Sequence, residues 1–291
     1  MKKTCLFVVL AMIVSVGVAE GAVWVGSKSV DLEGKKYWLS ASVEFTKMTL
    51  DGGSTGLKVV LTNTAGQEAV PPSLITDVMI PSQLLTAIFF DITGDPTLTP
   101  VSAIVPSASS TVYFDTEAPF PAPVAGGLDV GGEWAIKKGN LLVNVMDWPT
   151  NPLYGISSSG FGIFAPPNQD GTVYFGSPSL DNPIEVDGPN YGITAFGDNT
   201  ATGNAKVTGG VPLIKYQVEF TLTGIPDDLD VGSQIQAVRF QYGTSLDQPF
   251  LIPGQSLGIP EPASLVVWGL LTGGGLVALR CRRRFKGREA A

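Results

Sequence analysis

The clearest pattern along the chain is a strict alternation of apolar and polar residues over 214–223. The apolar positions are Ile214, Tyr216, Val218, Phe220 and Leu222. Because successive side chains of a β-strand point to opposite faces, this pattern predicts one strand with one face on a core and the other in water. The same alternation returns over 237–242, after a loop that is rich in turn-forming residues.

Further short strands are predicted over most of the chain between the two termini. Residues 42–50 and 57–62 flank 51–56, a probable hairpin loop, and 85–92 is a continuous apolar run typical of a buried strand. The other candidates are 101–105, 111–114, 134–137, 141–145, 160–164, 172–175 and 191–196. About a dozen short strands without a helical segment predict an all-β fold, either a sandwich or a jelly roll.

A proline-rich segment, 117–127, is the best candidate for an internal linker and would divide the chain into two small domains. All-β domains commonly reach about 200–250 residues, so a single domain over 23–258 with a long central loop is the preferred interpretation.

The two ends of the chain have a different pattern from the middle. Residues 1–22 combine Lys2 and Lys3, an apolar run over 6–18 and small residues at Gly17, Ala19 and Gly21. This order is that of a secretory signal peptide, with cleavage motifs that end at Ala19 and at Gly21. An uncleaved N-terminal anchor is the alternative, although the run is short for a spanning helix.

The C-terminal segment, 259–291, has three consecutive elements. Pro260, Glu261 and Pro262 come first, and an apolar stretch from Ala263 to Leu279 follows. As a helix its 17 residues would rise about 26 Å, near the lower limit for crossing a bilayer. The basic tail, 280–291, then begins; its arginines include Arg280, Arg282, Arg283 and Arg284. This charge would keep the tail in the cytoplasm while the rest of the chain is exported.

This segment resembles the PEP-CTERM sorting signal of Gram-negative bacteria in its Pro260-Glu261-Pro262 motif, its short glycine-rich apolar helix and its terminal arginines. The resemblance implies that an exosortase, a membrane-embedded enzyme resembling a cysteine transpeptidase, recognises the motif and cuts there. It also implies transient anchoring in the inner membrane, followed by release to the envelope, surface or extracellular matrix, in association with exopolysaccharide and biofilm. An ordinary single-pass membrane protein is the alternative.

The middle of the chain resembles an uncharacterised group of exosortase-dependent surface proteins. The stretches that carry this resemblance are 61–64, 84–92, 155–160, 191–194 and 240–244. The resemblance implies export to the surface and supplies no activity.

Composition narrows the classes of function. The chain contains no histidine, which excludes a Ser-His-Asp triad, a Cys-His pair and imidazole metal ligands. Cys5 and Cys281 both lie in the terminal segments, so the exported region cannot form disulfides. Those segments hold eight of the 18 Lys and Arg residues but three of the 26 Asp and Glu residues, which leaves 23–259 with a formal net charge of −13. Such an acidic region argues against nucleic acid as a partner and is compatible with neutral polysaccharide.

Candidate chemistry is limited. Residues 160–165 match a dinucleotide fingerprint, but the following prolines prevent the helix that the fingerprint requires. A glycosidase needs two carboxylates about 5–10 Å apart. The candidate acids are Glu133, Asp147, Glu185 and Asp187. Glu133 and Asp147 directly precede Trp134 and Trp148, aromatic residues that could stack on sugar. Any acidic chain offers such pairs, so no catalytic residue is assigned.

Asp227, Asp228 and Asp230 share one loop and are weak candidates for binding calcium, which takes six to eight oxygen ligands. Solvated turn aspartates are the simpler interpretation, and no cofactor is required. Of the tryptophans between the termini, Trp24, Trp38, Trp134 and Trp148, each would be a sugar-stacking platform if exposed and a core residue if buried.

These observations predict a non-enzymatic exported surface or matrix protein whose partners are the export machinery, an exosortase, the membrane and exopolysaccharide. The alternatives are a carbohydrate-binding module, which a pair of exposed tryptophans on one sheet would favour, and a glycan-active enzyme that uses two carboxylates.

Overall fold

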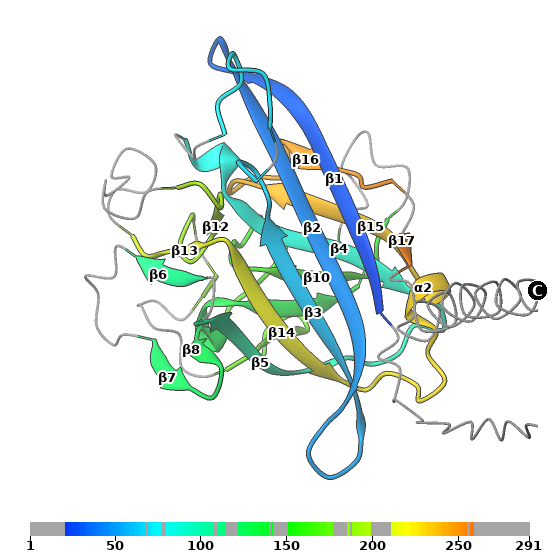
Figure 1. Ribbon diagram of the computed structural model, residues 1–291. Coiled ribbons are helices and arrows are strands. Elements are labelled where there is room, and N and C mark those ends of the chain that lie inside the picture. The colour runs from blue at the N-terminus through cyan, green and yellow to red at the C-terminus, as the bar shows by residue number, and fades with distance from the viewer. Residues whose placement is uncertain are drawn as a thin grey trace, which may run out of the picture. The chain divides into compact units, whose positions relative to one another are not determined.

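The computed structural model describes residues 21–67, 69–76, 80–107, 110–113, 121–139, 141, 151–176, 185–186, 188–198, 211–254 and 257–258. These residues form two β-sheets that enclose one apolar core (Figure 1). The predicted all-β class is confirmed. The predicted signal peptide and C-terminal helix lie outside the described residues, except for Gly21 and Ala22.

The first sheet is antiparallel throughout and has eight strands in the described part of the chain. In spatial order these are β17 (Leu257–Gly258), β1 (Gly21–Leu32), β2 (Lys35–Thr49), β3 (Thr55–Asn63), β14 (Gln217–Thr223), β5 (Thr99–Pro106), β8 (Gly127–Asp129) and β7 (Ala122–Val124). Strand β14 lies between β3 and β5, although more than 100 residues separate it from either of them along the chain.

The second sheet contains nine strands among the described residues. Its main path is β11 (Thr172–Tyr174), β9 (Ala135–Lys138), β10 (Tyr154–Ser157), β4 (Leu85–Ile92), β12 (Ile193–Thr194), β13 (Leu213–Lys215) and β6 (Thr111–Tyr113). Strand β15 (Ile235–Tyr242) also pairs with β4, and β16 (Phe250–Leu251) pairs with β15. The described helical turns are η1 (Pro81–Gln83), η2 (Gly131–Glu133) and α2 (Val231–Gln234).

The core lies between the sheets because each long strand turns its apolar face inward. Phe45 of β2 contacts Phe90 of β4 across the interface, with ring centroids 5.1 Å apart. Trp134, which precedes β9, packs edge-on against Phe220 of β14 at 5.0 Å. Both contacts are fully buried, and such aromatic pairs each add about 0.5–1.5 kcal/mol beyond the area that they bury.

The predicted buried strand 85–92 is confirmed as β4, and both of its faces are covered. Ile88 and Phe90 belong to the central core, whereas Ala87 and Phe89 pack on the opposite face against Phe164. This double burial explains why the stretch is apolar throughout, without alternation.

The long hairpin of β1 and β2 was not predicted over its full length. The sequence placed a strand only over 42–50, yet β2 begins at Lys35 and pairs with β1 from Leu32 back to Gly21. Glu33 and Gly34 form the two-residue turn with positive φ of 52° and 75°, the conformation that a tight hairpin requires. The adjoining hairpin between β2 and β3 was predicted, and a bond from Leu50 N–H to the Ser54 carbonyl closes its loop.

Two predicted strands are wrong in detail. Residues 214–223 do not form one strand: β13 belongs to the second sheet and β14 to the first. The chain changes sheet at Tyr216, whose φ of 82° breaks the alternation, so this ring is not on the core face as predicted. Residues 160–164 form a turn rather than a strand, with the N–H groups of Ile163 and Phe164 both bonded to the Gly160 carbonyl.

Candidate functional site

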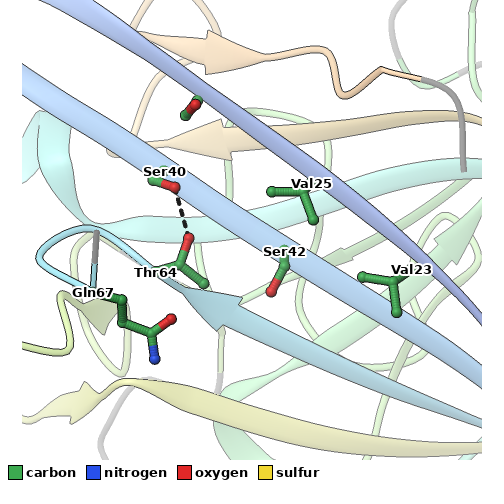
Figure 2. A pocket seen from close by; sticks show the side chains of 7 residues that line it. Val23, Val25, Ser40, Ser42, Thr64 and Gln67 are labelled. Atoms are coloured by element: carbon green, nitrogen blue, oxygen red, sulfur yellow. Dashed lines mark hydrogen bonds between the residues drawn. The ribbon is translucent and has the colours of Figure 1, made fainter. Parts of the chain in front are cut away.

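A hollow of about 360 Å³ lies on the outer face of the first sheet. Its lining consists of Val23, Val25, Ser27, Ser40, Ser42, Thr64 and Gln67 (Figure 2). Each of these side chains is apolar, a hydroxyl or an amide. The volume is within the range of small-molecule sites, about 300–1,000 Å³.

Strand alternation places these side chains on the outer face. In β1, Ala22 and Trp24 point into the core, so Val23, Val25 and Ser27 point outward. In β2 the inward residues are Leu39, Ala41 and Val43, which turns Ser40 and Ser42 outward. The register aligns Val25 with Ser42 and Ser27 with Ser40.

The loop after β3 forms one wall of the hollow. The hydroxyls of Thr64 and Ser40 are hydrogen bonded at 2.7 Å, which joins the loop to β2 (Figure 2). Ala65 is buried against Leu84, Ala195 and Leu213. Gly66 has a φ of 83°, a conformation that costs glycine little. These contacts hold Gln67, the next residue, at the rim.

An aromatic pair adjoins this wall. The side-chain amide of Gln67 donates to the Tyr216 hydroxyl at 2.8 Å. The Tyr216 ring packs edge-on against Phe196, with centroids 5.0 Å apart and an interplanar angle of 68°. Phe196 is 44% exposed, so one part of its ring is open to solvent. The positive φ of Tyr216 thus brings to this surface a ring that simple alternation would have buried.

Charged side chains lie next to the hollow but do not line it. One cross-strand row runs through Val25, Ser42, Thr62 and Gln217 and carries no ionisable group. The neighbouring cross-strand row on the same face contains Glu44 and Glu219. Lys58 forms an ion pair with Glu219, with Nζ 3.7 Å from the carboxylate. The hollow therefore offers hydrogen-bonding groups without a fixed charge.

The predicted carboxylate site is not assembled by the described residues. Glu133 is buried in η2 and Glu185 is half-buried, while Asp147, Asp187 and Trp148 lie outside the described residues. No carboxylate lines the hollow. Trp24 and Trp134 are buried in the core and Trp38 is half-buried on β2, so the described residues contain no pair of exposed tryptophans.

Two of the three aspartates of the calcium candidate, Asp227 and Asp230, accept hydrogen bonds within the protein. Asp230 caps α2, where its carboxylate accepts from Ser233 Oγ at 2.6 Å and from Gly232 N–H at 3.0 Å. These bonds, the one from Ser233 first, lower the pKa of the Asp230 carboxyl below its usual value. Asp227 accepts from the Thr55 hydroxyl.

A lysine already lies beside the carbonyls of this loop. Lys47 Nζ donates to the Leu229 carbonyl at 3.2 Å and to the Asp227 carbonyl at 3.4 Å. Within the described ranges, no three His, Cys, Asp or Glu side chains are grouped to hold a metal ion. Calcium binding by Asp227, Asp228 and Asp230 stays a prediction, which the melting temperature with and without EDTA would test.

Four of the five stretches that carry the second resemblance meet around β4, and the fifth, 61–64, joins them through β12. Ser157 Oγ of β10 donates to the Thr86 carbonyl at 3.2 Å, and Thr86 Oγ1 donates to the Gly243 carbonyl that follows β15. Asn63, at the end of β3, donates its amide to the Ile193 carbonyl of β12 at 3.0 Å. All of these side chains are buried. The bonds of Ser157 and Thr86 join neighbouring strands of the second sheet, and the bond of Asn63 joins the first sheet to the second.

The sorting residues lie outside the described residues: Pro260, Glu261, Pro262, the anchor from Ala263 to Leu279, and Arg280, Arg282, Arg283 and Arg284. Among the helices that the structure describes, none is long and apolar enough to cross a bilayer.

Comparison with known proteins does not assign this chain to a family. No family model matches the chain, and no curated protein or solved structure matches it either.

Proposed function

We propose that this chain is an exported, non-enzymatic surface or extracellular-matrix protein that an exosortase sorts and cuts near Pro260-Glu261-Pro262. The observation that carries the proposal is the order of motif, apolar stretch and arginine cluster directly behind the last strand of the β unit. Its partners would be the export machinery, the exosortase, the inner membrane during sorting and exopolysaccharide afterwards.

The boundaries of the β unit support this proposal. The compact unit spans Glu20–Ile259 and ends one residue before Pro260. Its two ends are neighbours at one edge of the first sheet, where Ala22 pairs with Gly258 and Val23 with Leu257. Loss of the segments before Glu20 and after Ile259 would therefore leave all the strands that the structure describes in place.

The start of β1 favours one of the two signal-peptide cleavage motifs. The Ala22 side chain is fully buried in the core, and Gly21 pairs with Thr46 of β2. A cut after Ala19 leaves β1 whole, whereas a cut after Gly21 removes its first paired residue. We therefore expect the mature protein to begin at Glu20.

A binding role has more support than catalysis. The hollow carries no carboxylate, and acid-base hydrolysis of a glycosidic bond needs two. Its uncharged hydroxyls, and the exposed Phe196 that packs on the Tyr216 bonded to Gln67, instead favour the carbohydrate-binding alternative. The tryptophan pair expected for that alternative is not present among the described residues.

The intact mass of the protein recovered from the native host's envelope and medium tests this proposal. We expect a mass that begins at Glu20 and ends near residue 260. Glu261→Ala should retain the tail, because proline and an acidic side chain in an extended segment form the recognition element. Glu289→Ala, which removes an acid outside the motif, should be processed like the wild type. A wild-type mass that still includes Arg280 to Ala291 would contradict the proposal.

A further inference from the structure

The hollow on the first sheet has the chemistry of a site for an uncharged, hydroxyl-rich polymer. Ser27 and Gln67 are exposed, and Ser42 and Thr64 are half-buried, so their polar groups are open to a ligand. Hydroxyls both donate and accept hydrogen bonds, and the amide offers both kinds of group as well. A ligand with many hydroxyls can pair with all of them without a counter-charge.

The valines complete this chemistry. Val25 is 47% exposed and lies beside Val23 on the same strand face. A pyranose ring has hydroxyls around its edge and aliphatic C–H groups on its faces. The two valines of β1 therefore offer an apolar patch for the ring face, next to the hydroxyls of Ser27 and Ser42 for the ring edge.

The aromatic pair extends the surface beyond the hollow. Gln67 belongs to the lining and is bonded to Tyr216, and Tyr216 packs on the exposed ring of Phe196. An exposed ring beside a polar hollow suits a ligand that is longer than one sugar unit, because one unit fills the hollow while another contacts the ring.

We propose that this hollow, with Phe196 and Tyr216 at its rim, binds a segment of a neutral polysaccharide. The inference rests on the proposed function, since it names what the exported protein would hold at the cell surface. An acidic polymer fits poorly, because Glu44 and Glu219 occupy the adjacent row of the same face. The predicted exported region is also strongly acidic, and like charges repel.

Native gel electrophoresis of the full chain, in gels that contain a soluble polysaccharide, tests this inference. The probes are hydroxyethyl cellulose and dextran, both neutral, and polygalacturonate, which is anionic. A polyoxyethylene detergent should be used, because alkyl glycosides would compete for the site. We expect a neutral probe to retard the protein and polygalacturonate to have no effect.

Two variants locate the site. Ser42→Phe should fill the hollow from its floor and weaken affinity by at least about tenfold. Phe196→Ala should weaken it by about three- to tenfold through loss of the exposed ring. The matched control, Thr221→Phe, adds the same ring to β14 on the same sheet and should leave affinity unchanged. If Ser42→Phe lowers the melting temperature, Gln67→Ala should be used in its place. Gln67 is exposed, so this substitution should not affect folding.

The inference is wrong if neither neutral probe retards the wild type, if only polygalacturonate does, or if Thr221→Phe weakens binding as much as Ser42→Phe. These outcomes are independent of the intact mass. A protein that is processed but does not bind would overturn this inference alone, and one that binds but keeps its tail would overturn the sorting proposal alone.

Discussion

The outer faces of the two sheets differ in what covers them. On the second sheet, Ala87 and Phe89 of β4 are fully buried beneath the turn that carries Phe161 and Phe164. On the first sheet, Val25 is nearly half exposed beside the hollow, and hydroxyl side chains surround it. One face therefore serves as a second core, while the other is open to a ligand.

This difference shows which sequence signals indicate fold and which indicate binding. The stretches that carry the second resemblance to exported surface proteins lie at the covered face and at the contacts between the sheets, where Thr86, Ser157 and Asn63 are buried. The hollow is built from valines, serines and a glutamine whose alternation is that of any half-exposed strand. A sequence resemblance in such a protein can therefore indicate its architecture and miss its binding surface.

The largest difference in the free energy of unfolding is expected between two alanine substitutions, one on the outer face of each sheet. Phe89→Ala should lower the free energy of unfolding by about 3–5 kcal/mol, because it empties a closed apolar layer. Val25→Ala should change it by less than about 0.5 kcal/mol, since that side chain is already in contact with water. Urea denaturation of both variants measures the difference. A loss below about 1 kcal/mol for Phe89→Ala would mean that the covering turn does not seal this face.

A smaller difference in stability is expected between two glutamine-to-leucine substitutions, one at Gln241 in the second sheet and one at Gln67 beside the first sheet. The buried amide of Gln241 donates to the carbonyls of Tyr242, Gln248 and Pro249 at 3.0–3.3 Å. Gln241→Leu should cost about 2–3 kcal/mol because it removes these bonds in a buried site. Gln67→Leu removes an exposed amide and should cost less than about 0.5 kcal/mol while weakening polysaccharide binding. Equal losses of stability from the two variants would contradict the contrast between the faces.

Much of the fold could be predicted from periodicity, and its exceptions have physical causes. The alternation over 217–223 and the apolar run over 85–92 predict β14 and β4 because each strand lies in a uniform environment along its length. Tyr216 was predicted in the core because apolar and polar residues alternate on both sides of it. This alternation does not show where the chain passes from one sheet to the other. The turn at Phe161 was predicted as a strand because its apolar side chains cover a sheet instead of joining it.

The candidate site was harder to predict than the fold. Its lining comes from β1, β2 and the loop after β3, and its aromatic rim comes from residues about 130 to 150 positions later. Of the two interpretations open for the tryptophans, the core residue is the correct one at Trp24 and Trp134. The sorting motif is the opposite case, since it is a contiguous segment that the sequence alone can indicate.

The smallest effect concerns the ion pair that holds the covering turn on the second sheet. Lys137 Nζ of β9 lies 2.7 Å from the Asp170 carboxylate and also donates to the Ile163 carbonyl at 2.7 Å. The hydrogen bond from Lys137 lowers the pKa of the Asp170 carboxyl below its usual value. Asp170 is largely exposed, so water screens the pair, and Asp170→Asn should cost only about 0.5 kcal/mol at pH 7.

The pH dependence of this cost identifies its origin. A carboxyl whose pKa is lowered in the folded state stabilises the fold above its ordinary pKa, and this contribution is lost as the pH falls through the lowered value. The difference between wild type and Asp170→Asn should therefore be constant near neutral pH and shrink below about pH 4, and about 1 M salt should reduce it as well. Asp51→Asn, in the exposed loop between β2 and β3, is the matched control and should show no such difference. If the cost of Asp170→Asn persists unchanged at pH 2, it does not come from the charge of Asp170, and the ion pair with Lys137 does not stabilise the covering turn.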